Sequence, residues 1–361
     1  MVKSLIILVL FTLILFGCKS NPTANKEPDP EKWESIPEFQ NISIRSIVKL
    51  NGTIFVAGVV NNSSGVIYSS NDAQTWNKLK EFPKIIGPLT INSDSLFCLG
   101  DSLYRFIIPL NKWETICQPD PVYQDPGAMG DMVVLYNKLY AMQTEFVNAA
   151  ATYLINYDGS TENLSVYINY QYRGGKFIKS KDYGKEIAYV RGQYWWGGFF
   201  VFDGVNFNSI QNGLSDMEIS NPPTNSMAIN GDTLFAGFRY PSRIKYLINN
   251  TWYNYTDTLP YSESAFLVKP TIITEPTAIT FFNNRLFCAT QSQGVFEWNK
   301  NKGWVKISNG LIFDTLVSEG FKDFYRPVVF LENLGQYLLA GYGNPGYAQW
   351  GGQGLYKWKL N

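Results

Sequence analysis

Histidine is absent from this sequence. Ser-His-Asp triads and Cys-His pairs need an imidazole as general base, and imidazole is a common zinc ligand. The sequence also lacks a Cys-x-x-Cys pair, a Gly-x-Gly-x-x-Gly turn, a phosphate-binding loop and a calcium-loop pattern of acidic residues. We therefore expect no catalytic triad, no metal site and no cofactor.

Net charge and long apolar runs are lacking too. The 30 basic residues balance the 30 acidic residues, so no overall field attracts nucleic acid or anionic lipid. Beyond the N-terminal segment, no apolar run reaches the length of about 18 residues that a membrane helix needs. We expect a soluble, monomeric body that has no nucleic-acid partner.

Aromatic residues, by contrast, make up 16% of the chain, and they recur within a repeat of short apolar runs. The clearest unit spans residues 281–311, where apolar runs alternate with turns rich in Asn and Gly. Such runs are typical of β-strands joined by tight hairpins. One unit therefore predicts a four-stranded antiparallel meander, which needs stacked neighbours to bury both of its faces.

Several versions of this unit follow one another along the chain. Their second strands align about 47 residues apart, which is within the range of propeller blades. The aligned triplets are Ile54-Phe55-Val56, Leu96-Phe97-Cys98, Leu139-Tyr140-Ala141, Ile187-Ala188-Tyr189, Leu234-Phe235-Ala236, Leu286-Phe287-Cys288 and Tyr337-Leu338-Leu339. Aromatic fourth strands recur as well, for example at 112–114 and 251–253.

The two chain ends predict how the repeats close into a ring. The last unit stops after a third strand at 354–360, and no fourth strand follows it. The segment 32–36, KWESI, resembles the fourth strand at 112–116, KWETI. We therefore predict an all-β, seven-bladed β-propeller of four-stranded antiparallel blades, with the N-terminal strand (32–37) completing the last blade. Six or eight blades stay open as alternatives, because the fourth unit is irregular between Tyr167 and Gly184.

Three of the four cysteines lie in the repeats. Cys98 and Cys117 are predicted on the second and fourth strands of one blade, about 10 Å apart and beyond the reach of a disulfide. Cys288 lies four units further on. We expect buried free thiols; the alternative, a catalytic thiol, lacks a base.

One segment resembles a known turn motif. Residues 69–76, SSNDAQTW, resemble the Asp-box, Ser-x-Asp-x-Gly-x-Thr-Trp, of sialidase-like and sortilin-like propellers. Asn71 replaces the Asp and Ala73 replaces the Gly. The Asn-Gly-Leu sequences at 212–214 and 309–311 are also common after such strands. The resemblance implies a degenerate Asp-box propeller over residues 32–361, in which the box stabilises a turn and carries no chemistry.

The N-terminus resembles a bacterial lipoprotein signal peptide. Lys3 precedes a mostly apolar stretch at 4–16, which is shorter than the about 20 residues of a spanning helix. Leu15-Phe16-Gly17-Cys18 resembles a lipobox, in which the Cys becomes the acylated N-terminus. An ordinary signal peptide with a chance Cys is the alternative. The resemblance implies cleavage after residue 17, acylation of Cys18 by palmitate-type chains, and a lipid anchor in the bacterial cell envelope, at its periplasmic face or the cell surface.

The composition of the segment after Cys18 predicts a flexible tether. Residues 19–31, KSNPTANKEPDPE, are polar and rich in proline, which is typical of a flexible linker. The predicted domains are therefore a signal peptide at 1–17, a lipidated Cys with a tether at 18–31, and the propeller at 32–361.

Loops at one predicted face of the ring are rich in aromatic and basic residues. We predict that this face binds a glycan or an envelope protein, because rigid rings offer contact area and polar neighbours add directional hydrogen bonds. The candidate ligand-binding residues are Tyr194, Trp195, Trp196, Arg239, Tyr240, Tyr325, Arg326, Tyr342, Tyr347 and Trp350. Alternatively, these rings pack between blades or cap the central channel.

A sialidase-like or other glycoside hydrolase is the alternative function. Such enzymes work with carboxylates, or with a tyrosine nucleophile in sialidases. Phe238-Arg239-Tyr240-Pro241 resembles the sialidase Phe-Arg-Ile-Pro motif, whose Arg contacts the substrate carboxylate. In that family the motif precedes the first Asp-box, whereas here it follows the Asp-box-like segment. We therefore favour a non-enzymatic binding module and assign no catalytic residue.

A further short pattern recurs in the turns. Asp-Ser-Leu or Asp-Thr-Leu occurs at 94–96, 101–103, 232–234, 257–259 and 314–316. These triplets resemble an O-glycosylation pattern of some envelope-rich bacteria. The same dipeptides are ordinary turn chemistry, so both interpretations stay open.

Overall fold

The computed structural model describes residues 32–117, 129–144, 152–157, 165–169, 177–182, 185–192, 198–220, 226–239, 241–260, 275–314, 324–343 and 353–360. The predicted signal peptide, Cys18 and the tether lie outside these ranges. Within the ranges, no helix combines the length and the hydropathy needed to cross a bilayer.

The described residues form seven four-stranded antiparallel sheets, which we number 1 to 7 along the ring. Sheet 1 consists of β2 (Ile42–Leu50), β3 (Thr53–Val60), β4 (Ser64–Ser70) and β5 (Asn77–Phe82), and sheet 2 of β6 (Leu89–Asn92), β7 (Ser95–Leu99), β8 (Leu103–Ile107) and β9 (Lys112–Cys117). Sheet 3 consists of β10 (Met129–Leu135), β11 (Lys138–Thr144), β12 (Thr152–Tyr157) and β13 (Ser165–Asn169), and sheet 4 of β14 (Phe177–Asp182), β15 (Lys185–Gly192), β16 (Gly198–Phe202) and β17 (Phe207–Ser209). Sheet 5 consists of β18 (Met227–Asn230), β19 (Thr233–Arg239), β20 (Ser242–Ile248) and β21 (Thr251–Asn254), and sheet 6 of β22 (Pro276–Phe282), β23 (Arg285–Thr290), β24 (Val295–Asn299) and β25 (Gly303–Lys306). Sheet 7 is β28 (Val328–Leu334), β29 (Tyr337–Tyr342), β30 (Gly354–Lys359) and β1 (Glu34–Ser35).

Short elements lie in the connections between sheets. The helix α2 (Asp216–Ser220) lies between sheets 4 and 5, and a two-stranded sheet of β26 (Phe313–Asp314) and β27 (Phe324–Tyr325) lies between sheets 6 and 7. Two 3₁₀ turns, η1 (Pro37–Phe39) and η2 (Ile108–Leu110), complete the described elements.

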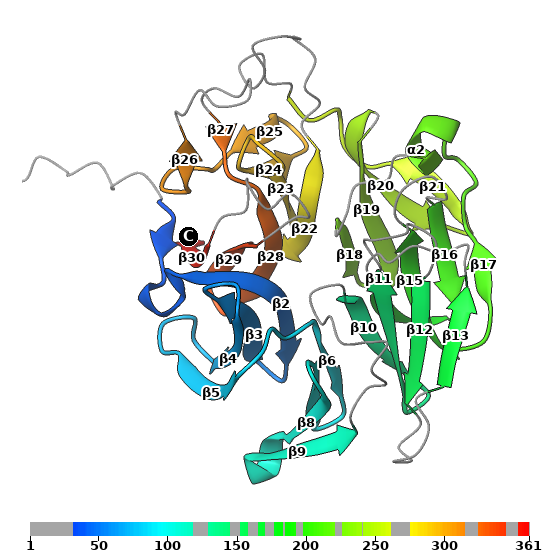
Figure 1. The fold of residues 1–361 in the computed structure, drawn as a ribbon. Coiled ribbons are helices and arrows are strands. Elements are labelled where there is room, and N and C mark those ends of the chain that lie inside the picture. Colours follow the sequence, from blue (N-terminus) through cyan, green and yellow to red (C-terminus); the bar gives the residue numbers. More distant parts are fainter. Residues whose placement is uncertain are drawn as a thin grey trace, which may run out of the picture.

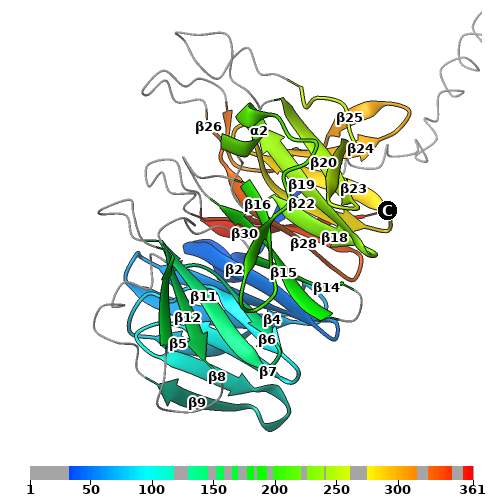
Figure 2. The ribbon, with the colours of Figure 1, turned by 90° about the vertical axis from the view of Figure 1, so that its right-hand side faces the viewer.

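The sheets follow one another around a ring. Contacts between first strands run in the order β2, β6, β10, β14, β18, β22 and β28, and β28 contacts β2 again. Figure 1 shows this order as a colour sequence from blue through green to red, with the first and last sheets adjacent. Figure 2 shows the twisted sheets from the side, with α2 and β26 toward the same side of the ring. The predicted propeller of four-stranded antiparallel blades is therefore confirmed.

Closure of the ring by the N-terminal strand is confirmed as well. Glu34 pairs with Lys357 and Ser35 with Tyr356, which places β1 antiparallel to β30 at the outer edge of sheet 7. The last sheet is therefore built from both ends of the described chain.

Trp33, immediately before β1, is held by the loop that follows β25. Its backbone N–H donates to Asn309 O at 2.8 Å, and its indole Nε1–H donates to Ile307 O at 2.5 Å. A Cβ on Gly310 would lie 2.4 Å from Trp33 O, so only glycine allows this close approach. The indole is buried and stacks on Trp358, with ring centres 6.1 Å apart. We call this arrangement the tryptophan clasp.

A second tryptophan clasp joins sheets 4 and 5. The backbone N–H of Trp252, in β21, donates to Asn212 O at 2.9 Å, and its Nε1–H donates to Ile210 O at 2.7 Å. A Cβ on Gly213 would again lie 2.4 Å from the tryptophan carbonyl oxygen. Trp33 thus has the environment of a fourth-strand tryptophan in an internal sheet, which explains why β1 completes the ring.

The seven aligned triplets all lie in second strands, as predicted. The hydrophobic core is divided into layers between neighbouring sheets, so each second strand is buried on both faces. Cys98 and Cys288 belong to two of these layers and are free thiols, as predicted, and burial raises the pKa of both. Cys117 lies in β9, and its side chain lies outside the described part.

In three sheets, the hairpin between the third and fourth strands is closed by the same type of turn. In sheet 1, the N–H groups of Gln74 and Thr75 both donate to Asp72 Oδ1 at 2.8 Å. In sheet 4, the N–H groups of residues 205 and 206 donate to Asp203 Oδ1 at 2.9 and 2.7 Å. In sheet 6, those of residues 301 and 302 donate to Asn299 Oδ1 at 2.9 and 3.1 Å. The side-chain oxygen thereby replaces backbone partners that a tight turn leaves unpaired.

Candidate functional site

The candidate face is formed by connections that leave one side of the ring. Because the sheets are antiparallel meanders, loops between second and third strands and connections between sheets emerge on the same side. Of the predicted ligand-binding residues, Tyr194, Trp195, Trp196, Tyr240, Tyr347 and Trp350 lie outside the described residues. Arg239, Tyr325, Arg326 and Tyr342 are described.

Arg239 is the last residue of β19, where sheet 5 opens onto this face. Its Nε lies 3.5 Å from Glu275 Oε2, and the two side chains are 41% and 17% exposed. The backbone carbonyl of Glu275 accepts a hydrogen bond of 2.9 Å from the N–H of Gln291, in the loop between β23 and β24. Arg239 is therefore held against sheet 6, although it belongs to sheet 5.

Tyr325, in β27, meets the same loop of sheet 6 from the other side. Its N–H donates to Ser292 O at 2.9 Å. Its ring lies 4.9 Å from the exposed ring of Phe313, and Lys306 Nζ lies 4.5 Å from its centre. Burial raises the pKa of the Tyr325 phenol. Partial burial leaves this ring as a rigid, neutral surface at physiological pH.

These contacts link residues of sheet 5, sheet 6 and β27 into one group, which we call the platform. It consists of Arg239, Glu275, Gln291, Ser292 and Tyr325. Arg326 follows Tyr325 directly and is anchored by its N–H, which donates to the carbonyl oxygen of residue 312 at 3.1 Å. The structure therefore brings together three of the four described candidates, Arg239, Tyr325 and Arg326, from different sheets.

Tyr342 lies elsewhere. It is fully buried in the layer between sheets 6 and 7, and its hydroxyl accepts a hydrogen bond of 3.0 Å from the N–H of Ile312. Its ring packs edge-on against Tyr356 at 5.3 Å, and burial raises the pKa of its phenol. Because no surface of Tyr342 is accessible, we leave it out of the binding face.

Glu275, Lys306 and Phe313 belong to the neighbourhood of the platform but were not singled out in the sequence. Lys306 ends the fourth strand of sheet 6, and Phe313 lies in β26. Nothing local distinguishes these residues from other charged or aromatic residues. The one signal in the sequence that could have indicated them is the position of the aromatic Phe313 in a connection between two repeats.

The Asp-Ser/Thr-Leu triplets differ in accessibility. Ser95 and Ser102 are buried. The Ser95 hydroxyl also donates to Asp94 Oδ1 and accepts from Arg105 Nε, both at 3.0 Å. Thr233 and Thr258 keep partial exposure, and residue 315 lies outside the described part. Turn and packing chemistry therefore accounts for the first two triplets.

In the described part of the chain, no three His, Cys, Asp or Glu side chains lie close enough together to hold a metal ion.

Comparison with known proteins places the chain by fold alone. No protein-family model matches it, and no curated protein matches it in sequence. Among solved structures, it resembles the extracellular domain of a protein assigned to the hybrid two component systems of B. thetaiotaomicron, at 12% identity and a TM-score of 0.58, over 92% of this chain and 40% of that chain. It also resembles Sqt1 of Saccharomyces cerevisiae, at 10% identity and a TM-score of 0.52, over 92% and 100% of the two chains.

A third similar structure is the β-propeller domain of Cps50 (Swd1) of Myceliophteria thermophila. The identity is 11% and the TM-score 0.52, over 91% of this chain and 100% of that chain. At such identities the likeness concerns the fold, and it identifies the architecture of this chain as a β-propeller.

Proposed function

We propose that this protein is a membrane-anchored envelope lipoprotein whose propeller is a non-enzymatic binding module for a glycan or a protein partner. The observation that carries the proposal is the platform, where contacts with the loop between β23 and β24 and with Glu275 hold Tyr325 and Arg239 on one face, with Arg326 next to Tyr325. Arg and Tyr are the residue types that most often dominate recognition surfaces, because they combine apolar contact with directional hydrogen bonds. Trp195, Trp196 and Trp350 belong to the proposed face on sequence grounds.

The test is affinity capture with residues 19–361 immobilised against a detergent extract of the host envelope, read by mass spectrometry and glycan analysis. We expect specific material to be retained. A double Arg239→Ala, Tyr325→Ala variant should lose at least about tenfold in retention, because each truncated anchor costs about 1 kcal/mol or more. Lys300→Ala is the matched control, since Lys300 is exposed in the hairpin between β24 and β25, on the other side of the ring.

Elution separates the two partner classes. A protein that survives a high-salt wash in fixed ratio identifies a scaffold, whereas material released by free sugars identifies glycan recognition. Equal retention by the double variant and by Lys300→Ala contradicts the platform as the interface. Turnover of chromogenic glycosides, lost in Arg239→Ala, would instead favour the glycoside hydrolase.

We also propose that Cys18 carries the lipid anchor, on the basis of the lipobox-like Leu15-Phe16-Gly17-Cys18. Acyl chains hold a protein to a bilayer by burying methylene groups, at about 0.8 kcal/mol each. A Cys18→Ser variant should leave the membrane fraction and lose incorporation of labelled palmitate. Unchanged fractionation and labelling would contradict the anchor.

The turns support a relation to Asp-box propellers. Asp72 caps the turn of the motif-like segment, and Ala73, at the position of the motif glycine, has a φ of 59°. Asp203 and Asn299 repeat that cap at the equivalent hairpins of two other sheets. We therefore propose that the repeats are degenerate Asp-box blades.

A further inference from the structure

The centre of the ring encloses a cavity of about 560 Å³. All seven first strands, β2, β6, β10, β14, β18, β22 and β28, contribute to its lining. Its volume lies within the range of about 300–1,000 Å³ that is typical of small-molecule sites. Because each first strand is the inner edge of its sheet, backbone polar groups border the cavity as well as side chains.

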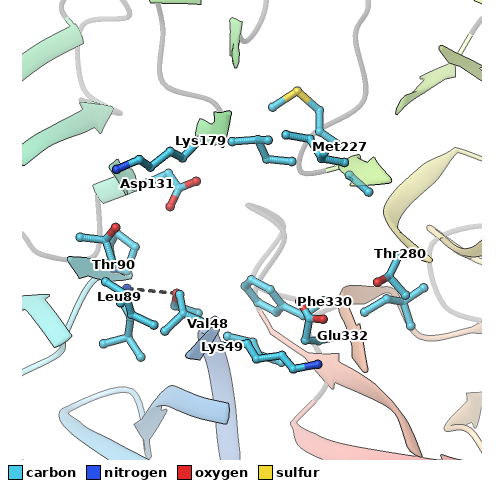
Figure 3. Close-up of a pocket in the computed structure, with 18 of the residues that line it drawn as sticks. Val48, Lys49, Leu89, Thr90, Asp131, Lys179, Met227, Thr280, Phe330 and Glu332 are labelled. Carbon is cyan, nitrogen blue, oxygen red and sulfur yellow. Dashed lines mark hydrogen bonds between the residues drawn. The ribbon is translucent and has the colours of Figure 1, made fainter. Parts of the chain in front are cut away.

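Two threonine hydroxyls on different walls of this cavity have no hydrogen-bond partner among the described residues. Thr90 comes from β6 and Thr280 from β22, and Figure 3 shows them on opposite sides of the cavity. They are only 8% and 7% exposed. Neither hydroxyl oxygen belongs to the fully buried polar atoms that lack a partner, so both open into the cavity, where a ligand with hydroxyl groups can pair with them.

Charged side chains in the cavity, by contrast, have partners within the protein. Lys49 Nζ donates to the carbonyl oxygen and the Oδ1 of Asn333, at 3.0 and 2.9 Å. Lys179 Nζ lies 2.8 Å from Glu186 Oε1. Lining groups of both signs are present, since Asp131 and Glu332 join Arg45 and the two lysines. A ligand with a net charge therefore gains little here.

Phe330 supplies an apolar surface beside these polar groups. It follows a shift of the β28–β29 register between Val328 and Phe330, a bulge that re-aims the side chains around it. Figure 3 shows its ring extending into the cavity, near Glu332. An aromatic face in a cavity that also carries threonine hydroxyls suits the C–H face of a sugar ring, whose edges carry hydroxyls.

We infer that the central cavity is a binding site for a neutral sugar of one or two rings, in which Thr90 and Thr280 pair with sugar hydroxyls and Phe330 packs against a ring face. This site is distinct from the platform. It does not rest on the proposed function, because Thr90, Thr280 and Phe330 belong to first strands and none of them belongs to the platform.

The test is titration calorimetry of residues 19–361 with glucose, galactose, mannose, N-acetylglucosamine, maltose, cellobiose and lactose, and with lysine and glutamate as probes with a net charge. At least one sugar should bind saturably with one site per chain, and the amino acids should not bind. No saturable sugar binding, or binding of the amino acids alone, overturns the inference.

Isosteric variants locate the site. Thr90→Val with Thr280→Val should weaken sugar binding at least tenfold and leave the melting temperature unchanged or higher, because it removes hydroxyls without protein partners. Thr277→Val is the control: Thr277 lies on β22, as Thr280 does, and its buried hydroxyl donates to Val328 O in β28. It should lower the melting temperature and preserve sugar binding.

Two further outcomes show whether the sugar binds in the central cavity or at the platform. Unchanged sugar affinity in the Thr90→Val, Thr280→Val variant overturns the inference. The Arg239→Ala, Tyr325→Ala variant should bind the sugar as the unaltered protein does, and loss of sugar binding in that variant also overturns it. The cavity site and the platform can therefore fail separately.

Discussion

Asp72 shows how one side chain organises a hairpin. Hydrogen bonds from the N–H groups of Thr75 and Gln74 are the largest influences on its carboxylate and lower its pKa. The native state therefore binds the charged form better than the unfolded chain does. This stability is present above the unfolded pKa of about 3.9 and is lost as the pH falls through the lower folded pKa.

We predict that Asp72→Asn lowers the melting temperature slightly at pH 7, because it reduces the free energy of unfolding by less than about 1 kcal/mol; the effect is small because the carboxylate is exposed to solvent. The difference from the unaltered protein should shrink as the pH falls through the lowered pKa of Asp72, because below that pKa both side chains are neutral. The reverse change, Asn299→Asp at the equivalent turn, should introduce the same pH dependence. Thermal denaturation between pH 3 and 7 measures both, and a difference independent of pH would contradict the role of the charge.

At the scale of elements, the tryptophan clasp connects the loop after one fourth strand to the fourth strand of the next sheet. Both described clasps combine a backbone hydrogen bond, an indole hydrogen bond and a glycine. Gly310 has a φ of 88° and Gly213 a φ of 81°, so each position demands glycine for its backbone conformation and for its close approach to tryptophan.

Gly310→Ala should destabilise the protein by more than its backbone strain alone, because the new Cβ meets the Trp33 carbonyl oxygen. Gly52→Ala is the matched control: Gly52 has a φ of 81° and open space around its Cβ position. We expect the control to cost about 1 kcal/mol and Gly310→Ala at least about 2 kcal/mol more. Denaturant unfolding compares them, and equal losses would show that the contact with Trp33 contributes nothing.

At the scale of the whole molecule, the ring has a single point where the two ends of the described chain meet. The connection there depends on two β1–β30 residue pairs and on the buried Trp33. Every other sheet is continuous in sequence, so its strands stay together through hairpins even when packing weakens. Sheet 7 has no such covalent support for β1.

Trp33→Ala should therefore destabilise the protein by about 3–5 kcal/mol and open the ring. Hydrogen exchange should accelerate in sheet 7 and at the β28–β2 contact. Trp304→Ala, in the fourth strand of sheet 6, removes an indole that donates to Asp257 O at 3.1 Å without touching the closure. Its effect should stay between sheets 5 and 6; the same exchange pattern in both variants would refute a special role for Trp33.

Much of the fold could be predicted because its signals are local and repeated. Apolar triplets such as Leu286-Phe287-Cys288 mark second strands, since a strand buried between two sheets needs apolar residues on both faces. The third-strand pattern at 354–360 and the KWESI segment at 32–36, which matches a fourth strand, predicted closure. The binding face was harder, because its arrangement depends on contacts between repeats, and Tyr342 is a core residue.

What the sequence by itself determined is the repeat, its strands and the closure, because hydrophobic pattern and turn residues act over a few positions along the chain. Only the tertiary structure decided which residues meet across the ring. Arg239 reaches Glu275, and Thr90 and Thr280 line one cavity, although their separations in sequence carry no signal. The physical reason is that these positions result from the closed packing of all the sheets, and no single repeat contains that information.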